Sequence, residues 1–175
     1  LLVDRATPQR LLPANQGVGL ARKIGCDLAL MLQHNGLVRS PWIHSSDADV
    51  VLPGDYFEGT GNILKESHSA LTYPFIHIPE GTPAQQLAIR LYEISLYYYV
   101  QGLRWAGSPY AYQTIGSTIA FRGWNYAAVR GFPKREAGED FYLLNKIAKT
   151  GTIVTPASSP IRIQGRLSDR VPFGT

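Results

Sequence analysis

The sequence contains a single cysteine, Cys26, among its 175 residues. This count excludes a framework of disulfides and fits a reducing compartment, so we expect a cytoplasmic protein. Cys26 lies within a helical pattern of apolar residues, and we interpret it as a small core residue. No apolar run approaches the roughly 20 residues that a membrane-spanning helix needs. The longest candidate, residues 87–106, is interrupted by arginines and a glutamate.

Charged residues are also scarce, at 17 % of the chain, and the formal net charge is only +4. The basic residues are scattered, except for Arg162, Arg166 and Arg170 near the C-terminus. Because no basic stripe is interleaved with aromatic residues, we do not expect nucleic acid as a partner. Hydrophobic residues make up 45 % of the chain. At this length, such a composition predicts one globular domain with a sizeable core.

Hydrophobic periodicity predicts an α/β fold. Apolar residues recur at helical spacing over 17–35, where Asn35 and Gly36 supply a stop. A second helix is expected to begin with Thr82 as its N-cap and Pro83 at its first position. Shorter helices are expected over 124–129 and 139–150, a turn with a weak helix over 52–64, and strands over 42–45, 70–77, 113–121 and, as the last strand, 153–154. Strands that alternate with helices favour a largely parallel sheet.

Two acidic pairs stand at the ends of predicted elements. Asp47 and Asp49 follow the apolar run 42–45, and their oxygens are ligands that Mg²⁺ and Mn²⁺ prefer. Glu139 and Asp140 precede a helical pattern about ninety residues later. Because strand side chains alternate, Asp47 shares a face with the side chain two residues before it, and His44 packs on the other face. We expect one acidic pair to hold a metal ion and the other to move a proton.

Four motifs follow one another in the chain. Residues 15–25 contain Gly-x-x-x-Ala-Arg, residues 46–49 contain Asp-x-Asp, residues 116–122 with 129–133 end in Gly-Phe-Pro, and residues 137–140 contain Gly-Glu-Asp. In this order and at these distances they resemble the motifs of the family 2 glycosyltransferases, which have the GT-A fold. Lys23 and Arg130 depart from that pattern, since the family has Asn and Gly there.

The resemblance implies a GT-A-like domain with a mostly parallel sheet flanked by helices. It covers residues 15–155 of a single domain 1–175, with residues 156–175 as a C-terminal extension. Nothing in the chain corresponds to the family's first strand–helix–strand unit, which forms much of the nucleotide pocket. We therefore expect an N-terminally truncated domain.

The resemblance also implies an activity, namely transfer of a sugar from a nucleoside-diphosphate donor with inversion, dependent on Mg²⁺ or Mn²⁺. The implied metal ligands are Asp49 and Asp47, and Asp47 also meets the donor. Arg22, Gly116 and Ser117 are implied to bind the donor, although Arg22 can equally pair with a carboxylate. The implied acceptor is a hydroxyl on a carbohydrate, a lipid-linked molecule or another compound, which allows peripheral association with the inner face of a membrane.

The second acidic pair is implied to do the proton chemistry. A carboxylate within hydrogen-bond reach of the acceptor hydroxyl can serve as general base, and we assign this role to Asp140. Glu139 is expected to hydrogen-bond the acceptor or nearby backbone, and Arg122 to orient the acceptor or Asp140. Both carboxylates also lie at a helix start, where capping the free N–H groups is the competing explanation.

Two other functions remain open at this point. Residues 47–51 also fit Asp-x-Asp-x-[Thr/Val], the nucleophile loop of haloacid dehalogenase-like phosphatases. In that enzyme Asp47 would attack phosphorus and Asp49 would act as acid and base. The third possibility is a non-catalytic module that holds a sugar nucleotide or a polysaccharide. Inhibition by vanadate would distinguish the phosphatase, and loss of turnover with retained binding in Asp140→Asn would distinguish the transferase.

Overall fold

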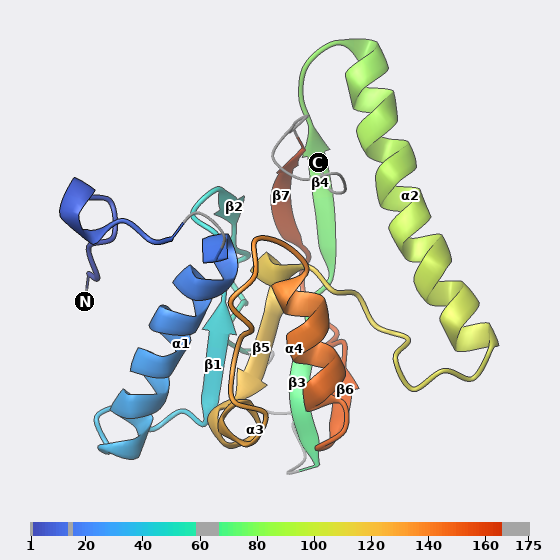
Figure 1. Ribbon diagram of the computed structural model, residues 1–175. Coiled ribbons are helices and arrows are strands. Elements are labelled where there is room, and N and C mark those ends of the chain that lie inside the picture. Colours follow the sequence, from blue (N-terminus) through green and yellow to red (C-terminus); the bar gives the residue numbers. More distant parts are fainter. Residues whose placement is uncertain (1, 14–15, 59–66, 166–175) are drawn as a thin grey trace.

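The computed structural model describes residues 2–13, 16–58 and 67–165, and it has an α/β fold with two mixed sheets and flanking helices (Figure 1). The elements in chain order are η1 (Pro8–Arg10), α1 (Gly17–His34), β1 (Trp42–Ser45), β2 (Val50–Val51), β3 (His68–Thr72), β4 (Phe75–Pro79), α2 (Pro83–Trp105), η4 (Gly116–Thr118), β5 (Ile119–Arg122), α3 (Gly123–Ala128), α4 (Glu139–Ile147), β6 (Thr152–Val154) and β7 (Ile161–Gly165).

The first sheet has the strand order β1-β5-β3-β6. Strand β5 runs antiparallel to both β1 and β3, and only β3 and β6 are parallel. The prediction of a largely parallel sheet is therefore wrong. Alternation of strands and helices does not reveal the direction of β5, which is set by the long connection through α2 that brings the chain back between β1 and β3.

The second sheet has the order β2-β7-β4, with β7 parallel to β4 and antiparallel to β2. The expected strand 70–77 is divided at Tyr73 and Pro74 into β3 and β4, which belong to different sheets. Residues 153–154 form β6 as expected, but β6 is not the last strand, because β7 follows it. The expected helix over 52–64 is not found in its described part, where residues 54–57 form turns, and residues 59–64 lie outside the described chain.

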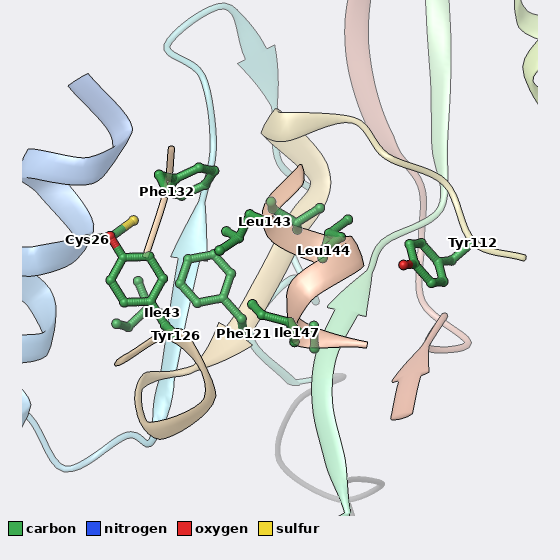
Figure 2. Packing of buried hydrophobic residues seen from close by; sticks show 11 residues of the cluster. Cys26, Ile43, Tyr112, Phe121, Tyr126, Phe132, Leu143, Leu144 and Ile147 are labelled. Carbon is green, nitrogen blue, oxygen red and sulfur yellow. The ribbon is translucent and has the colours of Figure 1, made fainter. Parts of the chain in front are cut away.

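Side-chain alternation divides the first sheet into two packed faces. One face packs against α1, α3 and α4, and Figure 2 shows the ring of Phe121 from β5 beside that of Tyr126 from α3. Their centroids are 5.0 Å apart. The other face contributes Leu71 and Ala120 to a cluster that includes Ile161 of β7. The first sheet therefore lies between a layer of helices and residues of the second sheet.

The predicted helix boundaries are confirmed at α1 and α2. Thr82 caps α2 in a capping box with Gln85, and Pro83 is its first residue. Cys26 is buried in the core as expected, and burial raises the pKa of its thiol to about 12. Within the described ranges, no helix is long and apolar enough to cross a membrane.

Candidate functional site

Arg22 of α1 contacts residues from three other parts of the chain. Its Nε lies 2.9 Å from Oε1 of Glu139, and its Nη2 lies 2.8 Å from Oδ1 of Asp47. Its Nη1 donates to Oγ of Ser45 at 2.8 Å and to the carbonyl oxygen of Gly116 at 3.1 Å. We call Arg22 with these four partners the arginine cluster. All three guanidinium nitrogens bind protein atoms, so in this structure Arg22 positions the two acids.

Burial makes the ion pair with Glu139 the strongest link of the cluster. The side chains of Arg22 and Glu139 are 10 % and 6 % exposed, whereas that of Asp47 is 43 % exposed. A buried carboxylate without its partner would carry an uncompensated charge at a cost of several kcal/mol. Glu139 therefore depends on Arg22, while Asp47 keeps access to solvent.

Two glycines explain why the chain can form this cluster. A Cβ atom on Gly116 would lie 2.6 Å from Nη2 of Arg22, so the guanidinium occupies the space of the missing side chain. A Cβ atom on Gly19 would lie 2.4 Å from the carbonyl oxygen of Pro133, and the Gly19 amide donates to the carbonyl of Arg135 at 3.0 Å. The first turn of α1 can therefore pack directly on the loop that leads into α4, which brings Arg22 within reach of Glu139.

Asp140 lies next to the cluster, in the first turn of α4. The N-cap residue of this helix, Gly138, has φ 69°. Burial, together with the neighbouring Glu139 carboxylate, raises the pKa of Asp140 to about 6. The amide of Phe141, which donates to Asp140 at 2.7 Å, and the charge of Arg22 oppose this rise. A carboxyl group with a pKa near 6 is suited to accept a proton near neutral pH.

The Asp-x-Asp element lies at the end of β1 as predicted. Asp47 lies two residues after the end of β1, and Asp49 lies in the exposed turn between β1 and β2. Among the described residues no group of three or more His, Cys, Asp or Glu could hold a metal ion by itself. Mg²⁺ is usually held by one or two carboxylates with substrate phosphates and water. The assignment of Asp47 and Asp49 as its ligands stays a prediction.

Arg122 is not brought to this site. The register pairs Ser45 with Ile119 and Trp42 with Arg122, so Arg122 lies at the opposite end of β5 from the cluster. Its Nε donates to the carbonyl of His68 at 2.8 Å, and its guanidinium lies 4.9 Å from the centroid of the Trp42 ring. The expectation that Arg122 orients the acceptor or Asp140 is therefore not supported by its position.

The remaining predicted residues are accounted for as follows. Ser117 is buried in η4 beside Gly116, and Asp49 lies in the exposed turn after β1. His44 packs against Tyr56, Phe57 and Tyr73 as expected of a strand residue, and burial lowers its pKa to about 4. In the C-terminal basic group, Arg162 lies on β7, and Arg166 and Arg170 lie outside the described residues, as does Asn15 of the first motif.

The sequence analysis did not assign a role to Ser45 or Tyr92. Alternation along the strand already placed Ser45 and Asp47 on one face, and Arg22 contacts both. Tyr92 of α2 is half-buried, and burial together with the charge of Asp140 raises its pKa. No sequence signal relates Tyr92 to Asp140, because this proximity arises from the packing of α2.

A cavity of about 260 Å³ lies between α2, α4 and residues 108–115. Its lining includes Ile115, which precedes Gly116, and Phe141, which follows Asp140. Tyr99 and Val100 of α2 contribute to the wall, and Asn145 of α4 supplies a polar group. The cavity therefore borders α4 at Phe141, and its lining includes no acidic residue.

Comparison with known proteins adds no further constraint. No family model matches the chain, and no curated protein is similar to it at a significant level.

Proposed function

We propose that this chain forms the metal- and acceptor-binding part of a glycosyltransferase, which moves a sugar from a nucleoside diphosphate to an acceptor hydroxyl with inversion. The observation that carries the proposal is the arginine cluster. Arg22, Asp47, Gly116 and Glu139 come from four motifs spread over more than a hundred residues, and direct contacts join them. Acidic residues that only face solvent or cap a helix are not expected to share one buried arginine.

The donor side of the site is formed by the Asp-x-Asp turn. Asp47 and Asp49 would hold Mg²⁺ or Mn²⁺ together with the diphosphate of the donor. When bound, the ion would stabilise the negative charge that develops on the departing diphosphate. Arg22 fixes the direction of Asp47 through the 2.8 Å contact, and it reduces the repulsion between Asp47 and Glu139. This pre-orientation lowers the cost of ordering the carboxylate when the donor binds.

The acceptor side is formed by Asp140. As the acceptor oxygen attacks the anomeric carbon, its O–H bond breaks and the proton moves to the Asp140 carboxylate. The bond from the anomeric carbon to the diphosphate oxygen breaks at the opposite face, and its electron pair leaves with the diphosphate. A pKa near 6 leaves Asp140 ionised at neutral pH while keeping it basic enough to accept this proton. We place the acceptor in the cavity lined by Phe141, the residue that follows Asp140.

The proposal is tested by measuring release of nucleoside diphosphate from a panel of nucleotide sugars, with Mn²⁺ and with a chelator. We expect release with at least one donor, loss of release with the chelator, and no effect of vanadate. Asp140→Asn should abolish release and retain Mn²⁺-dependent binding of the donor. Release of inorganic phosphate from simple phosphate esters, blocked by vanadate, would contradict the proposal in favour of a phosphatase. If the parent chain binds the donor but releases no nucleoside diphosphate, a non-catalytic binding module is favoured.

A further inference from the structure

Helix α2 has two apolar faces, and among the described residues the fold covers only one of them. The inner face packs on β4 and contains the buried residues Ile89 and Val100. Two side contacts fix its rotation: Glu93 accepts from the ring Nδ1 of His77 at 2.9 Å, and the Tyr97 hydroxyl donates to the carbonyl of Phe75 at 2.8 Å. Figure 1 shows α2 at the edge of the molecule, with no other labelled helix or strand on its outer side.

The outer face carries a stripe of large apolar residues. At 100° per residue these side chains fall within about 30° of one line, directly opposite Ile89 and Val100. Their exposed fractions range from 57 % to 93 %. The outer stripe consists of Leu87, Leu91, Ile94, Tyr98 and Trp105. It contains no charged residue and extends along most of a helix of 23 residues, about 35 Å in length.

The flanks of the outer stripe favour one occupant. Arg90, Tyr97 and Arg104 recur every seven residues on one side, and the other side carries Ala88, Ser95, Tyr99 and Gly102, none of which is charged. If a second copy packed stripe to stripe in antiparallel orientation, the arginines of the two helices would face each other. In parallel orientation they would face alanine and glycine. Neither arrangement supplies an acid to pair with them.

We propose that the outer stripe of α2 lies on a membrane surface that contains anionic lipids. An interfacial helix inserts an apolar face with Leu and Trp about 5–10 Å into the headgroup region and places basic residues beside it. Tyr98 and Trp105 are residue types enriched at that depth, and Arg90 and Arg104 would meet lipid phosphates. The inference concerns a surface outside the arginine cluster and does not depend on the proposed activity.

The test is co-sedimentation of the chain with vesicles, with no substrate present. Vesicles of equal parts phosphatidylglycerol and phosphatidylcholine should bind the parent chain, and vesicles of phosphatidylcholine alone should bind it at least tenfold more weakly. Leu91→Gln with Ile94→Gln should weaken binding tenfold or more, because two apolar side chains no longer leave water. Arg90→Gln and Arg104→Gln should each weaken it about fivefold.

The matched control is Trp124→Gln on α3, because this side chain is 80 % exposed but lies away from α2, whereas Trp105 is 93 % exposed on the stripe. Trp105→Gln should weaken vesicle binding and Trp124→Gln should leave it unchanged. In a Trp124→Phe background, anionic vesicles should shift tryptophan emission to the blue. Equal effects of the two tryptophan substitutions would overturn the proposal. So would a dimer in sedimentation equilibrium that Leu91→Gln with Ile94→Gln dissociates while vesicles are not bound.

Discussion

The Lys23 ammonium donates to the carbonyl oxygen of Arg130 at 3.4 Å, so the two positions that depart from the glycosyltransferase pattern contact each other. Lys23 also pairs with Asp27 at 2.9 Å, and Asp27 accepts from the Tyr126 hydroxyl at 2.8 Å. The departures therefore form a local arrangement of their own and leave the contacts of Arg22 intact.

The backbone at Arg130 provides the first prediction. Arg130 has φ 66°, and it is the one residue other than glycine with positive φ among the described residues. This conformation costs a residue with a side chain about 1–2 kcal/mol, whereas glycine adopts it freely. Arg130→Gly should therefore raise the free energy of unfolding by about 1 kcal/mol in urea denaturation. Arg130→Ala keeps the conformational cost and serves as control; a glycine variant less stable than the alanine variant would contradict this explanation.

Removal of the Arg22 guanidinium should destabilise the fold. Arg22→Met leaves the buried Glu139 without its charged partner, and we expect a loss of about 3–5 kcal/mol in the free energy of unfolding. The control is Lys23→Met, which breaks a more exposed pair with Asp27 and should cost about 1 kcal/mol or less. Combining Arg22→Met with Glu139→Leu should restore part of the loss, because no charge is then left buried. Strict additivity of the two single changes would show that the residues are not coupled.

Gly116→Ala tests whether the guanidinium needs the space beside this glycine. The new methyl group would collide with Arg22, which four contacts hold in place, so we expect a loss of about 1–3 kcal/mol in stability together with reduced turnover. Gly25→Ala in α1 is the matched control, because no atom lies within 4 Å of its added Cβ. That control should stabilise the helix by about 0.5–1 kcal/mol. Equal changes in stability for Gly116→Ala and Gly25→Ala would contradict a close contact between Gly116 and the Arg22 guanidinium.

The raised pKa of Asp140 makes stability and activity change in opposite directions. The folded pKa of about 6 exceeds the ordinary value of 3.8, so the charged carboxylate destabilises the folded state above pH 6. This penalty disappears as the pH falls from about 6 to about 4, where the folded chain holds the proton. Asp140→Asn should therefore raise the free energy of unfolding at pH 7 by up to about 3 kcal/mol, and it should make that energy less dependent on pH.

The same group predicts the pH profile of turnover. Since the general base must be ionised, kcat/KM should rise with pH and reach half of its plateau near pH 6. A capping role for Asp140 predicts the reverse for stability, because Asn or Ala would then destabilise α4. Thermal unfolding of Asp140→Asn at pH 7 and at pH 5 decides between the two explanations.

The site could be predicted further than the sheets could. The motifs identified Arg22, Asp47 and Glu139, and strand alternation placed Ser45 on the face of Asp47. The position of Arg122 could not be predicted, because it depends on the register between β1 and β5, which no local pattern reveals. Arg122 comes only five residues after Ser117 in the sequence. Because β5 between them is extended, the two residues lie at opposite ends of that strand.

The second sheet shows a different limit. The alternating Ile-Arg-Ile-Gln of β7 is a strand signal that the sequence analysis did not use, whereas β2 has only two residues and offers none. On α2, apolar residues recur at helical spacing on both faces, and this pattern does not indicate which face packs against the sheet. That choice depends on the contacts of Glu93 and Tyr97 with β4, which lie between residues distant in sequence.

The central claim is that the Asp-x-Asp turn and Asp140 serve one reaction at one site. The most direct measurement is calorimetry of nucleoside-diphosphate binding with and without Mn²⁺, for the parent chain, Asp49→Ala, Asp140→Asn and a control, Asp4→Asn. We predict Mn²⁺-dependent binding that is lost only in Asp49→Ala, with turnover lost in both Asp49→Ala and Asp140→Asn. Unchanged Mn²⁺-dependent affinity in Asp49→Ala, or full turnover in Asp140→Asn, would contradict the account.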